Sequence, residues 1–219
     1  MIIPQKIPNN GILLVDKPIG ISSFGIVKKV RTAFNVKKVG HAGTLDPLAS
    51  GLLIILIGKE NTKKANQFLK LDKTYEVEAS LGQTSSTGDN EGKLKKASDN
   101  KPTLSKIKKV LNEFRDEISQ IPPIYSALKV KGERSYQLAR KGEKPDLAKR
   151  KVIIYKIENI SYKYPKLNFS CAVSSGTYIR SLVEDIGKKL KTGAFTSQLR
   201  RITIGKYNVE DAISLDKIG

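Results

Sequence analysis

Two side chains capable of chemistry stand in a polar stretch directly before the longest apolar run of the chain. His41 is the only histidine, and Asp46 is followed by Pro47. The proline removes a backbone donor and favours an extended conformation at Asp46, so we expect the carboxylate to project from a loop. A rigid scaffold can hold one reactive side chain in this way. The plainer alternatives are that Asp-Pro marks an ordinary turn and that the lone histidine is structural.

The element that must position this loop is a strand predicted at residues 52–57, which are six consecutive aliphatic residues closed by Gly58. An unbroken apolar run predicts a strand covered on both faces, because a half-exposed strand would alternate. Gly40, Gly43 and Gly51 would let the preceding loop turn sharply and approach other groups closely.

The fourteen residues 40–53, Gly-His-Ala-Gly-Thr-Leu-Asp-Pro-Leu-Ala-Ser-Gly-Leu-Leu, closely resemble the active-site loop of the TruB family, the bacterial tRNA pseudouridine-55 synthases. The resemblance spans about residues 11–215. It continues in order through Asp-Lys-Pro-Ile-Gly-Ile-Ser-Ser at 16–23, Lys-Thr-Tyr at 73–75, Gln-Ile-Pro-Pro-Ile-Tyr-Ser-Ala-Leu-Lys at 120–129, Ser-Gly-Thr-Tyr-Ile-Arg at 175–180 and Leu-Arg-Arg at 199–201.

This resemblance implies an α+β protein with the pseudouridine synthase fold, a mixed and largely antiparallel sheet flanked by helices with a central active-site cleft. The alternation of predicted strands and helices agrees with an α+β class. We expect a single catalytic domain over residues 1–219, with a basic insertion at about 123–151 that clamps RNA. Since the chain ends at Gly219, we expect no C-terminal PUA RNA-binding domain of the kind that longer members carry.

The activity implied by the resemblance is the isomerisation of uridine 55 in the T-loop of tRNA to pseudouridine. The N1 glycosidic bond breaks and C5 bonds to C1′, after the base has been flipped out of its stack. Asp46 would start the reaction, either by attacking C1′ or by assisting loss of the C2′ proton. Arg180 would keep Asp46 charged and oriented. Tyr75 would stack on the uracil and could help to move the C5 proton.

The same resemblance implies the residues that bind the substrate. His41 would fill the space left by the flipped base, and Tyr178 would line the pocket beside Arg180. The other expected binding residues are Lys17, Gly43, Thr44 and Leu199. Plainer roles stay open for three of the residues: a solvated turn for Lys17, the edge of a core for Tyr75, and an ion pair with Glu184 for Arg180.

The charge of the chain favours a polyanionic partner, which the resemblance implies is the T-arm of tRNA. Forty Lys and Arg against 21 Asp and Glu give a formal charge of +19. No apolar run approaches the roughly 20 residues needed to cross a membrane, and no signal peptide is recognisable. The single cysteine, Cys171, excludes an intrachain disulfide and favours a reducing cytoplasm.

We expect no metal and no cofactor. One His and one Cys cannot supply the usual ligands of a zinc site, and no Gly-rich phosphate loop is present. The chain is expected to act as a monomer. Two rival functions stay open at this point: an RNA-binding or tRNA-folding module without turnover, and a glycosylase that removes uracil.

Periodicity predicts several of the remaining elements. A helix should begin at Ser22 or Ser23, with Phe24, Val27, Val30 and Phe34 on its apolar side. A strand should begin near Tyr75, and residues 83–102 should form a surface excursion with a hairpin around 88–92, to which we assign no chemistry. Two paired strands are predicted at 152–160 and 167–173, and a last helix at 210–218.

Overall fold

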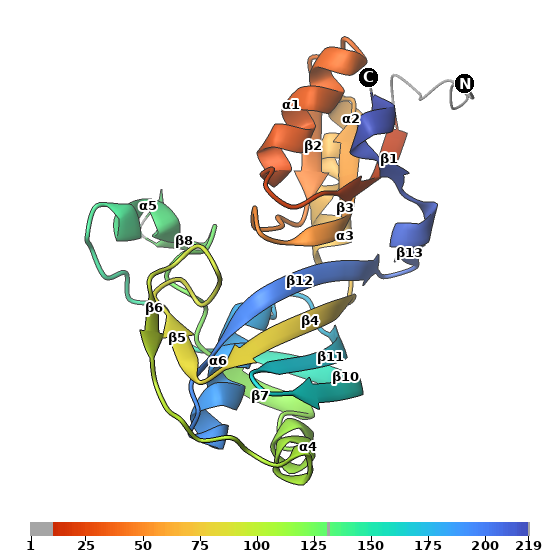
Figure 1. The fold of residues 1–219 in the computed structure, drawn as a ribbon. Helices are drawn as coiled ribbons and strands as arrows, with labels where there is room; N and C mark the ends of the chain where they lie inside the picture. Colours follow the sequence, from red (N-terminus) through yellow and green to blue (C-terminus); the bar gives the residue numbers. More distant parts are fainter. Residues whose placement is uncertain (1–10, 131, 219) are drawn as a thin grey trace. The chain divides into compact units, whose positions relative to one another are not determined.

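The computed structural model describes residues 11–130 and 132–218, which fall into two compact units (Figure 1). Unit 1 comprises residues 11–74 and 200–218, and unit 2 comprises residues 75–199. Two strands, β4 (Lys73–Leu81) and β12 (Ala194–Ile204), begin in one unit and end in the other. Both units contain sheet and helix, which confirms the α+β class.

Unit 1 is a sheet built around one central strand. Its other elements are β1 (Gly11–Lys17), α1 (Ser23–Ala33), β2 (Val39–Ala42), β3 (Ser50–Ile57), α2 (Lys59–Lys63), α3 (Ala65–Leu69), β13 (Tyr207–Asn208), β14 (Ile213–Ser214) and 3-10 turns at Val209–Asp211 and Leu215–Ile218. The strand order is β14–β1–β3–β12. One edge of β3 pairs antiparallel with β1. Its other edge pairs antiparallel with β2 and parallel with the end of β12.

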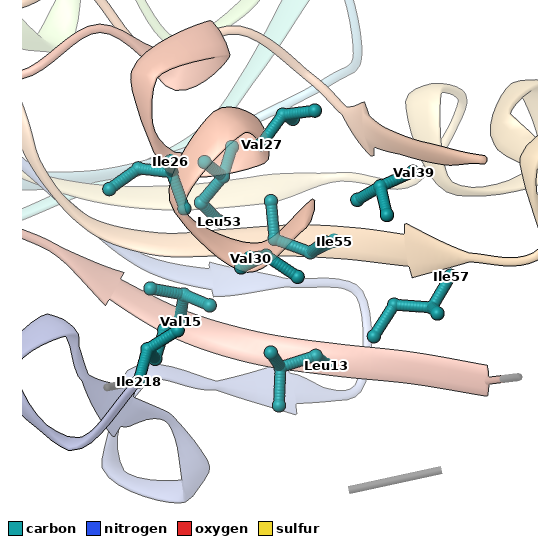
Figure 2. Packing of buried hydrophobic residues seen from close by; sticks show 10 residues of the cluster. All are labelled: Leu13, Val15, Ile26, Val27, Val30, Val39, Leu53, Ile55, Ile57 and Ile218. Atoms are coloured by element: carbon teal, nitrogen blue, oxygen red, sulfur yellow. The ribbon is translucent and has the colours of Figure 1, made fainter. Parts of the chain in front are cut away.

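The central strand β3 is covered on both faces, as its sequence predicts. Leu53, Ile55 and Ile57 enter one core cluster, which they share with α1 and β1. Figure 2 shows the α1 residues Ile26, Val27 and Val30 over this face of the strand. The alternate residues of β3 enter a second cluster with Phe68 and Ile204; they are Leu52, Ile54 and Leu56. The strand therefore forms a rigid base for the loop that precedes it.

The predicted apolar side of α1 is wrong at its first position. The helix begins as expected, because the Ser22 side chain caps it by accepting from the Gly25 amide. The residues that pack on the sheet are Ile26, Val27 and Val30, whereas Phe24 is 63% exposed. Successive residues of an α-helix are about 100° apart around its axis, so the buried stripe formed by Ile26, Val27 and Val30 is centred away from Phe24.

Unit 2 is a second stretch of sheet with its own helices. Its elements are β5 (Gln83–Ser85), β6 (Leu94–Lys96), α4 (Leu104–Asn112), β7 (Asp116–Gln120), β8 (Lys129–Val130), β9 (Glu133–Arg134), α5 (Ser135–Arg140), β10 (Arg150–Lys163), β11 (Lys166–Val173) and α6 (Ile179–Leu190). The order is β12–β4–β11–β10–β7. The antiparallel pair β10–β11 confirms the two strands predicted there, and the hairpin β5–β6 confirms the one expected in the surface excursion.

Two predictions about segments have different outcomes. The predicted last helix at 210–218 is wrong: Ile213 and Ser214 pair in parallel with Val15 and Asp16 of β1, so a short strand separates two 3-10 turns. Pairing with a distant strand overrides the local helical pattern.

The predicted RNA-clamping insertion at 123–151 contains β8, β9 and α5, and residue 131 lies outside the described residues. The role of this insertion stays a prediction, as does the single catalytic domain.

Candidate active site

Asp46 lies in the loop that joins β2 to β3, and hydrogen bonds fix the backbone on both sides of it. Ahead of it, the Leu45 amide donates to Ser23 Oγ at 2.8 Å, and Ser23 Oγ donates to the Leu45 carbonyl at 3.0 Å. Behind it, the Ala49 amide donates to the Asp46 carbonyl at 3.0 Å. Asp46 is half-buried and Thr44 is exposed. The loop thus holds a partly accessible carboxylate on a backbone with little freedom.

The turn after β1 packs against this loop through a buried lysine. Lys17 is fully buried, and its Nζ donates to the carbonyls of Pro18 at 2.9 Å, Ile21 at 2.8 Å and Pro47 at 3.4 Å. The Gly20 amide also donates to the Pro47 carbonyl, at 2.8 Å. The turn therefore supports the loop. The predicted contact of Lys17 with RNA stays untested, and its position gives it a structural task.

The sequence reasoning missed Arg201, which ties β12 to the start of the same loop. Its guanidinium is buried, with Nε donating to the Leu52 carbonyl at 2.8 Å and Nη2 to the Gly43 carbonyl at 3.0 Å. Gly43 has a φ of +90°, a conformation that side chains rarely adopt. The only sequence signal was the place of Arg201 in the family motif Leu-Arg-Arg, which does not reveal what its side chain contacts.

A second buried cation lies next to Arg201. Lys73 Nζ donates to the carbonyls of Leu69 and Leu71. Burial, and then the positive charge of Arg201, lower the pKa of Lys73 to about 8. Lys73 therefore fixes the end of α3 at the point where the chain enters β4.

Gly51 lets β12 approach β3 closely. Arg201 lies opposite Gly51 in the parallel register. A Cβ on Gly51 would stand 2.7 Å from the Arg201 amide nitrogen and closer still to its carbonyl oxygen. Gly51 also has a φ of +100°. Glycine is therefore required where the strand that carries Arg201 meets the loop that carries Asp46.

In unit 2, the predicted arginine is buried and held by three partners. Arg180 is 5% exposed at the start of α6. Nη1 donates to the Thr87 carbonyl at 2.8 Å, and Nη2 donates to the Tyr125 carbonyl at 2.7 Å. Nη1 also lies 3.3 Å from Asp89 Oδ2. A guanidinium with this many directed contacts has one orientation.

Asp89 is the partner of Arg180 that sequence reasoning did not find, because residues 83–102 were assigned no chemistry. It is 2% exposed. Its Oδ1 accepts from the Glu91 amide at 3.0 Å and from Thr87 Oγ1. The hairpin loop is itself anchored, since Asn90 Nδ2 donates to the Ser197 carbonyl at 2.6 Å. A buried carboxylate needs such hydrogen bonds to remain charged.

The other predicted residues of unit 2 lie on strands or at a helix start. Tyr75, at the beginning of β4, and Leu199, in β12, are each 8% exposed. Tyr178 is the N-cap of α6, and its backbone is clamped by Gln120: the Tyr178 amide donates to Gln120 Oε1 at 2.8 Å, and Gln120 Nε2 donates to the Tyr178 carbonyl at 3.0 Å. Gln120 thus fixes the residue two places before Arg180.

The predicted site residues divide between the two units. Unit 1 gathers Asp46 with Lys17, His41, Gly43 and Thr44, and His41 is half-buried on β2, in register with Ile55 of β3. Unit 2 contains Tyr75, Tyr178, Arg180 and Leu199. The pairing of Asp46 with Arg180 involves both units and stays a prediction.

Within the described residues, no group of three or more His, Cys, Asp or Glu side chains could hold a metal ion. In the same part of the chain, no helix has the length and apolar character needed to cross a membrane.

Comparisons with family models and with known proteins match most of the chain to the same family. Tested against protein-family models, residues 31–179 match "TruB family pseudouridylate synthase (N terminal domain)", and residues 180–219 match "tRNA pseudouridylate synthase B C-terminal domain". The tRNA pseudouridine synthase B of Aquifex aeolicus (strain VF5) is 44% identical over 210 residues, which are 95% of this chain and 73% of that protein. The protein of the same name from Endomicrobium trichonymphae is 44% identical over 218 residues, covering 95% of this chain and 94% of that protein.

Solved structures agree in fold. A Cbf5-Nop10-Gar1 complex matches with a TM-score of 0.73 and 30% identity, over 95% of this chain and 53% of that chain. An H/ACA RNP bound to a substrate RNA containing 2′-deoxyuridine matches with a TM-score of 0.71 and 28% identity, over 98% of this chain and 55% of that chain. This chain spans about half the length of both. It has the pseudouridine synthase fold and is an isomerase. On these matches, it belongs to the TruB family of pseudouridylate synthases.

Proposed function

We propose that this enzyme converts a uridine of tRNA, at position 55 in the T-loop, to pseudouridine. The observation that carries the proposal is the half-buried carboxylate of Asp46 on a braced loop, in a chain of the pseudouridylate synthase family. Relatives that carry the name tRNA pseudouridine synthase B support tRNA as the substrate. A solved relative bound to substrate RNA supports an RNA substrate in general.

In the proposed reaction, Asp46 starts the cleavage of the bond between N1 of uracil and C1′. It does so either by attacking C1′ or by assisting loss of the C2′ proton. The detached base turns and C5 bonds to C1′; in the route where Asp46 has attacked C1′, the bond between Asp46 and C1′ breaks as C5 takes its place. The proton on C5 leaves to solvent, and N1 takes up a proton from solvent, so the product is an isomer of the substrate. Since no water has to be delivered to the sugar, the second carboxylate that glycosidases usually need is not required.

Arg180 is proposed to hold Asp46 ionised and oriented during this step. The bonds to Thr87, Tyr125 and Asp89 support this role, because they fix the guanidinium in advance. A guanidinium has five donors, so it can serve a second carboxylate as well as these partners. Asp89 acts through Arg180 and is a positioning residue.

Of the remaining residues, all but Lys17 are proposed to contact the RNA at or next to the flipped nucleotide. Tyr75 stacks on the uracil, with Tyr178 and Leu199 beside it, while His41 occupies the space that the base leaves. Gly43 and Thr44 present the loop to the RNA. Lys17 is proposed to act indirectly, through its bond to Pro47, because its ammonium is buried among carbonyls.

The T-arm is the proposed site of contact, and the basic segment 123–151 is proposed to close over it. The formal charge of +19 supports this, because phosphate contacts by Lys and Arg dominate the affinity of proteins for RNA. The affinity should therefore fall steeply with salt concentration. We propose that the enzyme works as a monomer, without a metal or cofactor.

The proposal is tested with tRNA that carries tritium at C5 of uridine. Pseudouridine formation should release one tritium per tRNA to water and no free uracil. Release of free uracil would instead identify a glycosylase. Tight binding of tRNA without either product would identify a binding module and would overturn the proposed activity.

A further inference from the structure

Two large apolar side chains of unit 1 stand out from its surface. Ile19 is 65% exposed and Phe24 is 63% exposed, the highest values for large apolar side chains in the part of the chain that the structure describes. Single apolar residues on a surface are common and carry no message. These two, however, occur together in the short segment 18–24, in which Pro18 is also exposed.

This segment is bonded to the loop of Asp46 at two points. The residue after Ile19 donates its amide to the Pro47 carbonyl at 2.8 Å. The residue before Phe24 is Ser23, whose Oγ exchanges hydrogen bonds with Leu45 at 2.8 and 3.0 Å. Each exposed side chain therefore starts one residue away from a group that touches the loop. Both residues are therefore held close to the loop that carries Asp46.

The core gives no reason for an aromatic residue at position 24. The face of α1 that packs on the sheet is filled by Ile26, Val27 and Val30, all at most 2% exposed (Figure 2). The turn before the helix is closed by other contacts, with Ser22 as the cap. The ring of Phe24 is 63% exposed and is not part of this core, so most of its surface is open to a partner.

The charge around Phe24 indicates the kind of partner. Lys28 lies one helical turn further along α1, on the same face as Phe24, and it is exposed. Lys29 and Arg31 are exposed as well, and no residue of α1 is acidic. An aromatic plane beside basic side chains is the usual arrangement for a base stacked on protein with its phosphate nearby.

We propose that Phe24 stacks on an unpaired base of the RNA substrate next to the target nucleotide. Ile19 packs against the same unstacked region, as apolar side chains do where they part neighbouring bases, and Lys28 neutralises an adjacent phosphate. This inference rests on the proposed function, and it adds a substrate-binding surface outside the predicted set of site residues.

The test uses the absence of tryptophan from the chain. Phe24→Trp keeps an aromatic plane and introduces the only indole fluorophore. Leu104→Trp is the matched control, because Leu104 is 41% exposed at the start of α4 in unit 2. Titration with an unmodified tRNA transcript should quench the fluorescence of the Phe24→Trp protein saturably and leave that of the control protein nearly unchanged.

A second series separates stacking from simple apolar contact. Phe24→Ala and Phe24→Leu should both weaken tRNA binding by about 5- to 100-fold, the range that alanine substitution of stacking residues gives. Phe24→Tyr should bind nearly as tightly as the wild type. Circular dichroism of each variant confirms that the fold is kept, as expected for an exposed position.

Two results would overturn the inference. One is equal quenching, or none, in both tryptophan variants while filter retention shows that they bind tRNA. The other is a change in fluorescence with protein concentration in the absence of RNA, which would identify a second copy of the chain as the partner. Tritium release by the wild type is measured separately. It would persist if only this inference failed, and it would be missing if the proposed function failed.

Discussion

Replacing Gly51 by alanine tests whether the close approach of β12 to β3 builds the active-site loop. The substitution carries two costs. A residue with a side chain at a φ of +100° is strained by about 1–2 kcal/mol. The new Cβ would also overlap the Arg201 backbone, 2.7 Å from its nitrogen. Overpacking of this kind costs about 1–3 kcal/mol more. We expect the free energy of unfolding to fall by about 2–5 kcal/mol.

The matched control is Gly20→Ala, because it shares the strain without the overlap. Gly20 has a φ of +89°, and apart from Gly20 and its two chain neighbours no residue has an atom within 4 Å of the point where the new methyl group would stand. Its cost should be the strain alone, about 1–2 kcal/mol. Urea unfolding followed by circular dichroism gives both values, provided that the slope m is unchanged. Equal losses in the two variants would refute the reasoning that Gly51 is needed for close approach.

Three further predictions concern buried charged or titratable groups. Asp89→Asn leaves Arg180 without its buried counter-charge, so we expect a loss of about 3 kcal/mol of stability and at least a tenfold slower single turnover; the exposed Asp99→Asn should change neither. For Lys73, the folded pKa of about 8 lies below the usual 10.5, so the unfolded state binds more protons between these values. The stability of the wild type relative to Lys73→Met should therefore rise from pH 8 to pH 10, and a flat difference would contradict this. Burial raises the pKa of Cys171 to about 12, so a thiol-reactive disulfide reagent at pH 8 should react only after urea unfolds the protein, and rapid reaction of the native protein would count against it.

Much of unit 1 could be predicted from the sequence, because its central strand leaves no alternative. A strand of six successive aliphatic residues must be buried on both faces, and the two faces of β3 do pack in two separate core clusters. The stripe of α1 was harder to place, because Phe24 is apolar and falls at helical spacing. Spacing alone does not say whether an apolar residue packs on the core or binds a partner.

The candidate site depends more on contacts between distant segments. Asp46 has the local pattern of an ordinary turn, and only the family resemblance singled it out. Asp89 lies in a polar hairpin loop, and what distinguishes it from other loop carboxylates is its ion pair with Arg180, a residue far along the chain. Arg201 likewise has its role through hydrogen bonds to the distant carbonyls of Gly43 and Leu52. Contacts between distant residues produce no periodic pattern in a single sequence, so they cannot be predicted from it. The pairing of β14 with β1, which replaces the predicted last helix, could not be predicted for the same reason.

The central claim is that the carboxylate of Asp46 starts the reaction. Asp46→Asn keeps the shape of the side chain and removes its charge and nucleophilicity, so it separates chemistry from binding. Single-turnover release of tritium from tRNA labelled at C5 of uridine is the most direct measurement, with tRNA affinity determined on the same samples. We predict no release above background, with an affinity within a few-fold of the wild type. Full turnover by Asp46→Asn would contradict the account.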